Sequence, residues 1–186
     1  MKKIGIIISP GFEEIEAITP IDILRRSGLE VITLGIGSTS VKGSHNIVIE
    51  TDFLIDDYID VDDVEGIVIP GGMPGATNIV NSTAAIKIVE KTYNKNCLVA
   101  AICASPGVVL GSLGLLVNRD FTCYPSFEDR VEGGIFLEQS VVVSDNIITS
   151  RGPGTAMEFS LAIVSYLISK EKADIISTAL LFPRIS

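Results

Sequence analysis

The most constraining feature of this sequence is a series of short apolar runs separated by helical stretches. Apolar runs of strand length occupy residues 4–8, 30–34, 66–70, 98–102 and 147–150. Strands that are apolar on both faces are typical of a parallel sheet, which helices cover on its two sides. The alternation therefore predicts a doubly wound α/β fold, in which a mostly parallel sheet has helices on both faces.

The segments between these runs complete the pattern. Helices are predicted over residues 13–27, 83–93, 155–169 and 173–180, a hairpin over 40–51 and a further strand over 140–143. Thr155 and Glu158 have the spacing of a capping box at the start of the third of these helices. The acidic segment 56–63 is interpreted as a solvated connection. No repeat, linker or low-complexity segment divides the chain, so we expect a single domain over residues 1–186.

Hydropathy raises the question of a membrane. The chain is 47% hydrophobic, its mean hydropathy is +0.47, and residues 96–118 contain no charge, as a spanning helix would require. Pro106, Gly107, Gly111 and Gly114 interrupt that stretch, which suits a strand, a turn and a short helix better. The apolar run 4–8 is too short for a secretory signal. We therefore expect a cytoplasmic protein that does not bind membranes.

Charge and cysteine content exclude further classes. A net charge of −9 argues against partners that are nucleic acids or anionic membrane surfaces. The cysteines are Cys97, Cys103 and Cys123, with no C-x-x-C motif, and His45 is the single histidine. A zinc site of ordinary spacing cannot be built from this set, so we expect free thiols, no metal and no cofactor.

Two glycine-bearing strand ends are candidates for ligand binding. The segment LGIGSTS, residues 34–40, lacks the third glycine of a dinucleotide loop, and a strand pattern follows it, so it is interpreted as a turn. In IVIPGGMPGATN, residues 67–78, a buried strand leads into Gly71 and Gly72. Backbone N–H groups of glycine can approach a ligand closely because no Cβ intervenes. This segment is either a tight turn or a cradle for an anion or oxyanion.

The third candidate is Cys103 in AAICASPGVVL, residues 100–110. A lone cysteine is commonly a buried core residue, and that alternative applies here too. Cys103, however, follows a buried strand, and Pro106 suits the first turn of a helix. A sharp strand-to-helix turn with small neighbours has the mechanics of a nucleophile elbow. The N-terminus of the following helix is expected to lower the pKa of the Cys103 thiol and to favour the thiolate.

Further blocks of sequence point to a family. They are GFEEIEA with DILRRSGLEV near the start, VIPGGMPGA in the middle, AAICASP around the cysteine, and TSRGPGTAMEF near the end. In order and spacing, over nearly the whole chain, they resemble the ThiJ/PfpI superfamily and specifically its Parkinson-associated deglycase branch. The resemblance implies a flavodoxin-like fold that is usually a homodimer.

The resemblance also implies roles for particular residues. Cys103 matches the reactive cysteine of the family, and Glu16 matches the carboxylic acid that forms a hydrogen bond with it. Gly72 and Ala104 match the backbone donors of the oxyanion pocket. The residues alone do not single out Glu16, because the glutamates of EEIE read equally well as the acidic first turn of a helix.

One position departs from the family pattern. Many members carry a histidine beside the cysteine, in a segment that reads FTCYPSF here, and Tyr124 occupies its position. With an ordinary pKa of about 10, tyrosine is a poor general base near neutral pH. The resemblance places the hairpin that carries His45 near the site of a dimer partner, so His45 is a second auxiliary candidate.

Two functions remain after these exclusions. The first is a deglycase or glyoxalase that acts on small reactive 2-oxoaldehydes such as methylglyoxal, or on their adducts with protein amines and thiols. Cys103 would form a hemithioacetal, Gly72 and Ala104 would hold the oxyanion, and a protonated Glu16 would move a proton. The alternative is a redox sensor or redox-regulated chaperone that responds to oxidative stress through oxidation of Cys103.

Overall fold

The computed structural model of the protein describes residues 3–58 and 63–182. Its strands are β1 (Lys3–Ile8), β2 (Glu30–Gly35), β3 (Ser40–Lys42), β4 (Val48–Glu50), β5 (Phe53–Leu54), β6 (Val64–Ile69), β7 (Leu98–Ile102), β8 (Asp120–Phe121), β9 (Ile135–Phe136), β10 (Val141–Ser144) and β11 (Ile147–Ser150). Its helices are α1 (Glu14–Arg26), α2 (Gly75–Asn81), α3 (Thr83–Asn94), α4 (Ala156–Leu167) and α5 (Lys170–Ala179), with short turns η1 (Ile55–Tyr58), η2 (Pro106–Leu110), η3 (Glu128–Arg130) and η4 (Pro153–Thr155).

A seven-stranded sheet in the order β10-β11-β7-β6-β1-β2-β5 forms the centre of the protein. All neighbouring strands in it are parallel except β10 and β11, which are antiparallel. The mostly parallel α/β fold predicted from the apolar runs is therefore confirmed. The hairpin predicted over 40–51 is also present, as the antiparallel pair β3–β4.

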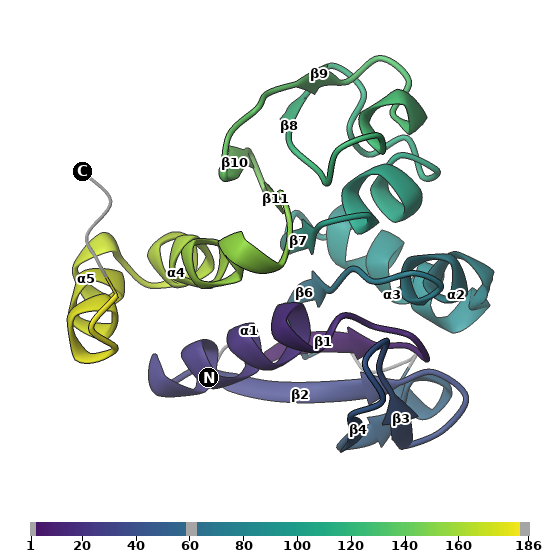
Figure 1. Ribbon diagram of the computed structural model, residues 1–186, viewed down its shortest axis with the longest axis horizontal. Coiled ribbons are helices and arrows are strands. Elements are labelled where there is room, and N and C mark those ends of the chain that lie inside the picture. The colour runs from purple at the N-terminus through teal and green to yellow at the C-terminus, as the bar shows by residue number, and fades with distance from the viewer. Residues whose placement is uncertain (1–2, 59–62, 183–186) are drawn as a thin grey trace.

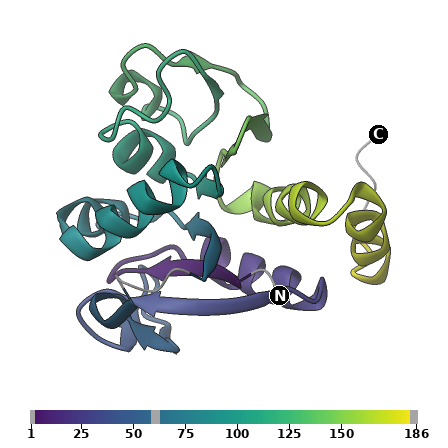
Figure 2. The ribbon, with the colours of Figure 1, turned by 180° about the vertical axis from the view of Figure 1, so that it is seen from behind.

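Helices cover both faces of the sheet, and the strands alternate between two apolar layers. On β1, Ile7 packs in the layer that contains α2 and α3, whereas Ile6 and Ile8 pack in the layer that contains α1, α4 and α5. Figures 1 and 2 show α4 and α5 on one side of β7, and α2 and α3 on the other. Burial on both faces explains why the strands read as continuous apolar runs.

Several local predictions were wrong. α2 lies within a segment that the sequence indicated as a loop, and α5 begins at Lys170 rather than at 173. Ser169 starts that helix because its hydroxyl accepts a hydrogen bond from the Lys172 N–H at 3.1 Å. Thr155 forms no capping box with Glu158; its hydroxyl instead pairs with Ser150 Oγ at 2.7 Å.

Two remaining predictions concern the acidic connection 56–63 and the question of a membrane-spanning helix. In the acidic connection 56–63, Tyr58 is buried and residues 59–62 lie outside the described ranges. Within residues 3–58 and 63–182, no helix is both long and apolar enough to cross a bilayer.

The sheet topology determines where a site can form. β1, β6 and β7 are adjacent and parallel, so their carboxyl ends meet at one edge. The segments that leave this edge are residues 9–13, 70–74 and 103–105. Ligand sites of doubly wound sheets form at such an edge, outside the carboxyl ends of the strands.

A cysteine-centred candidate site

Cys103 is the first residue after β7, and its backbone has a left-handed conformation with φ of 67°. A residue other than glycine rarely adopts this conformation and does so at a cost in free energy. Two backbone hydrogen bonds hold it there: the Cys103 N–H donates to the Ser150 carbonyl at 2.9 Å, and the Tyr124 N–H donates to the Cys103 carbonyl at 2.8 Å. The Cys103 side chain is only partly buried. This geometry is the sharp turn that the sequence predicted.

Glu16 of α1 reaches the same edge and is completely buried, with 0% of its surface exposed. Its Oε2 atom accepts a hydrogen bond from the Gly71 N–H at 2.8 Å, and its carboxylate also accepts one from the Cys103 thiol. Its second oxygen, Oε1, has no partner among the described residues. Gly71 permits this contact because a Cβ there would lie 2.6 Å from both Cys103 Cβ and Glu16 Oε2.

The backbone N–H groups of Gly72 and Ala104 form hydrogen bonds with the Cys103 sulfur. Gly72 has φ of 92°, and a Cβ there would lie 2.5 Å from Glu13 N and from Gly11 O. Only glycine allows the loop after β6 to bring its N–H group to the sulfur. The four residues that the resemblance singled out for the site, Cys103, Glu16, Gly72 and Ala104, therefore lie together.

Burial raises the pKa of Glu16 to about 7, although the hydrogen bonds from Cys103 and Gly71 oppose the shift. Burial and the ionised Glu16 carboxylate also raise the pKa of the Cys103 thiol, against the N–H groups of Ala104 and Gly72. The prediction of a lowered thiol pKa was therefore wrong. The turn after the cysteine, η2, has only five residues, and its dipole does not offset burial beside a carboxylate.

Because the pKa of Glu16 is raised to about 7 and that of the Cys103 thiol is raised above its ordinary value, the pair releases its first proton near neutral pH and holds one proton above it. Two forms of the pair carry the same single negative charge: a thiol beside a carboxylate, and a thiolate beside a carboxylic acid. The N–H groups of Gly72 and Ala104 face the sulfur and so stabilise the thiolate form. Nucleophilic chemistry by a cysteine requires this second form, since the thiolate rather than the thiol is the nucleophile.

Tyr124 lies beside the site with 46% of its surface exposed. Its ring approaches Gly152, where a Cβ would lie 3.2 Å from the ring and 4.0 Å from Glu16 Oε1. The two residues line a cavity of about 230 Å³, whose other walls are Pro125, Arg151, Pro153, Gly154 and Thr155. The sequence did not predict this wall, although the glycine and proline content of RGPGT was a signal for a special loop.

His45 lies in the turn between β3 and β4. Its ring contacts Glu14, the first residue of α1. Its Nδ1 atom lies 2.9 Å from Glu14 Oε2 and 3.5 Å from Glu13 Oε1. In the described part of this protomer the ring has no hydrogen bond to Cys103. Whether His45 reaches the site of a partner protomer stays a prediction.

Glu13, Glu14 and His45 also offer ligand atoms within 4.8 Å of one another, a spacing that a metal ion could occupy. Hydrogen bonds already engage Glu14, whose Oε1 accepts from the His45 backbone N–H at 2.7 Å. Burial raises the pKa of Glu14, but the bonds from His45 and Ser44 outweigh it and lower the pKa to about 2. We therefore interpret this group as an anchor for the hairpin.

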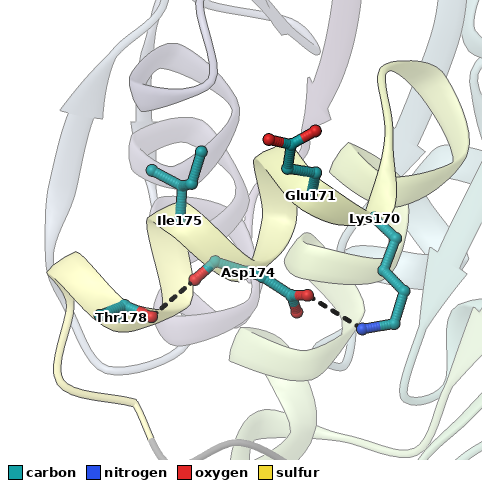
Figure 3. A pocket seen from close by; sticks show the side chains of 5 residues that line it. All are labelled: Lys170, Glu171, Asp174, Ile175 and Thr178. Atoms are coloured by element: carbon teal, nitrogen blue, oxygen red, sulfur yellow. Dashed lines mark hydrogen bonds and ion pairs between the residues drawn. The ribbon is translucent and has the colours of Figure 1, made fainter.

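A second hollow, of about 610 Å³, lies along α5 and lacks the groups for chemistry. Figure 3 shows its lining side chains, Lys170, Glu171, Asp174, Ile175 and Thr178. Lys170 and Asp174 form an ion pair of 3.0 Å one helical turn apart, an arrangement common on exposed helices. None of the described lining residues is a thiol or a histidine, so the cysteine site remains the candidate.

Comparison with known proteins identifies a family and relatives for this chain. The pattern of the DJ-1/PfpI family matches residues 2–166. Protein DJ-1 homolog B of Arabidopsis thaliana is 39% identical over 175 residues, which are 92% of this chain but 40% of that protein, so the chain spans under half of it. Glutathione-independent glyoxalase DJR-1.2 of Caenorhabditis elegans is 37% identical over 164 residues, 87% of this chain and 86% of that protein. The structure of oxidised DJ-1 from Toxoplasma gondii has a TM-score of 0.95 and 37% identity, covering 99% of this chain and 100% of that one.

Proposed function

Because the chain belongs to the DJ-1/PfpI family, we propose that it is a cysteine-dependent glyoxalase or deglycase that needs no glutathione. Its substrates would be 2-oxoaldehydes such as methylglyoxal, or their adducts with protein amines and thiols. The single observation that carries the proposal is the arrangement around Cys103, whose sulfur faces two backbone N–H groups and a buried carboxyl group. The relative named as a glutathione-independent glyoxalase supports it.

The first step is attack of the Cys103 thiolate on the aldehyde carbon. A C–S bond forms, and the carbonyl π electrons move to oxygen, giving a hemithioacetal alkoxide. The N–H groups of Gly72 and Ala104, which form hydrogen bonds with the sulfur, would donate to that oxygen. Glu16 in its protonated form supplies the proton that neutralises the alkoxide.

The second step is an internal redox rearrangement that requires no external oxidant. The Glu16 carboxylate takes the proton from the former aldehyde carbon, and an enediolate forms. Glu16 returns this proton to the neighbouring carbon while the hydroxyl proton of the hemithioacetal moves to the neighbouring oxygen, which gives a thioester of a 2-hydroxy acid. Water then attacks the thioester, releasing the acid and the Cys103 thiol. A pKa of about 7 suits Glu16 for both roles, since it gives and accepts protons near neutral pH.

Tyr124 favours a second candidate function. Without a histidine at this position, Glu16 has no imidazole beside it to share the work of activating water. The site would then serve as a redox sensor in which two molecules of peroxide each transfer one oxygen to the Cys103 sulfur and leave as water. A protonated Glu16 and the two N–H groups would stabilise the resulting sulfinate by hydrogen bonds.

Lactate formation from methylglyoxal by the purified protein tests the first proposal. We expect turnover by the unmodified protein, loss of it in Cys103→Ser, and retention in the matched control Cys97→Ser, since Cys97 lies at the amino end of β7. Absence of lactate, together with peroxide oxidation at Cys103 before Cys97 and Cys123 in peptide mass mapping, would favour the sensor. Oxidation of another cysteine first would contradict both candidates.

A further inference from the structure

We infer that Arg151 selects 2-oxoaldehydes that carry a carboxylate on the far end of the molecule. This inference rests on the proposed function, because it names the class of substrate for the same cysteine. The substrate would place its aldehyde at Cys103 and its carboxylate at the Arg151 guanidinium. Such a compound, 4,5-dioxopentanoate, has the reactive group of methylglyoxal and an anionic tail.

The first observation is the cavity between the loop 151–155 and Tyr124. Its volume of about 230 Å³ corresponds to roughly eight water molecules, which suits a small metabolite. One wall is Gly152, and the absence of a side chain there brings the cavity close to the catalytic acid. A Cβ at Gly152 would lie 4.0 Å from Glu16 Oε1, the buried oxygen that has no partner among the described residues. An unsatisfied oxygen at this position points to a ligand group that completes its hydrogen bonding.

The second observation is the charge of the cavity. Among the described residues that line it, Arg151 alone carries a formal charge. The whole chain has a net charge of −9, which repels an anionic substrate, and a local cation in the cavity opposes this repulsion. A guanidinium can donate two parallel hydrogen bonds to a carboxylate, and this adds orientation to the attraction.

The third observation is the present partner of Arg151. Its Nη1 atom lies 3.1 Å from Glu138 Oε1, but the Glu138 side chain is 80% exposed, whereas that of Arg151 is 23% exposed. Water screens an ion pair with so exposed a partner, and such pairs contribute little to stability. A substrate carboxylate can therefore replace Glu138 at the guanidinium at small cost.

Loop 151–155 is held in place for this role. The Thr155 hydroxyl accepts a hydrogen bond from the Gly152 N–H at 3.1 Å and pairs with Ser150 Oγ. The Ser150 carbonyl in turn accepts a hydrogen bond from the Cys103 N–H. Arg151 thus lies on a short, hydrogen-bonded segment that begins at the residue bonded to the Cys103 backbone.

The test compares 4,5-dioxopentanoate with its neutral methyl ester. For the unmodified protein we expect kcat/KM for the acid to exceed that for the ester by roughly tenfold, mainly through KM, as a charged hydrogen bond would give. Arg151→Gln should bring the ratio near one, and Arg151→Lys should restore part of it. The control Glu138→Gln should not lower the ratio. Equal kcat/KM for acid and ester in the unmodified protein would overturn the inference while leaving the glyoxalase proposal intact.

A second readout does not require turnover. Both compounds can form a hemithioacetal with Cys103 and protect it from iodoacetamide, which peptide mass analysis measures. We expect the acid to protect at a lower concentration than the ester, and Arg151→Gln to remove the difference. If lactate formation from methylglyoxal fails but this difference is present, the glyoxalase proposal is wrong and the anion site stands. If the ester protects equally well, the anion site is wrong.

Discussion

Replacing Glu16 by glutamine should change the pH dependence of stability by an amount that follows from burial of the carboxyl group. The pKa of Glu16 is raised from 4.5 to about 7 in the folded protein. Below pH 4 both the folded and the unfolded chains hold the proton, so this group costs little. Between the two pKa values the unfolded chain releases its proton and the folded chain keeps it, so stability falls as pH rises. Each pKa unit corresponds to about 1.36 kcal/mol, and the full loss is therefore about 3 kcal/mol at pH 8.

Glutamine keeps the shape of the side chain and does not titrate. The free energy of unfolding of Glu16→Gln minus that of the unmodified protein should therefore increase by about 3 kcal/mol between pH 4 and pH 8. Urea denaturation followed by circular dichroism, under reducing conditions, measures both values at each pH. The control Glu138→Gln removes an exposed carboxyl group and should show a nearly constant difference. A constant difference for Glu16→Gln as well would refute a raised pKa and, with it, the proposed proton transfer.

Three further predictions concern the cysteine site and the hairpin. Gly71→Ala should destabilise the protein and abolish alkylation of Cys103, because the new Cβ would lie 2.6 Å from Cys103 Cβ. The control Gly154→Ala should do neither, since nothing lies within 4 Å of its new Cβ; thermal unfolding and peptide mass mapping measure both effects. Tyr124→His should raise turnover of methylglyoxal near neutral pH, where histidine titrates, and no gain in a protein with unchanged circular dichroism would contradict a site limited by its base. Ile47→Asp should convert the expected homodimer into a monomer in light scattering, since Ile47 is 55% exposed on the hairpin; an unchanged mass would contradict a hairpin interface.

The apolar runs were sufficient to predict the class of fold. Residues such as Ile6 and Ile7 face opposite layers, so a strand that carries both must be covered on its two sides. Strands buried on both faces consist of continuous apolar residues, so the order of strands and helices could be predicted from the apolar runs. The capping prediction failed because the Thr155 hydroxyl has other partners nearby: it bonds to Ser150 and Gly152 rather than to the start of α4.

The cysteine at the strand end was also visible in the sequence, because small neighbours and Pro106 indicate a sharp turn. The acid was not, since EEIE offers equivalent glutamates and only the family resemblance selected Glu16. In the structure the difference is clear: Glu14 anchors the hairpin through His45, while Glu16 turns into the sheet edge toward Gly71. Which side of the helix faces the sheet depends on packing against β1 and against α4, and α4 is remote in sequence.

The proton affinities of the site could only come from the tertiary structure. The sequence indicated a lowered pKa for Cys103 from the helix that follows it, because local order was the only information available. Folding places the thiol in a partly buried position beside Glu16, and both effects raise its pKa. A pKa depends on how the surroundings of a group stabilise its charged form. For Cys103 most of those surroundings come from other segments of the chain, namely from Glu16, Gly71 and Gly72. The sequence therefore determined the sheet and the position of the cysteine, and the tertiary structure decided the proton affinities of Cys103 and Glu16.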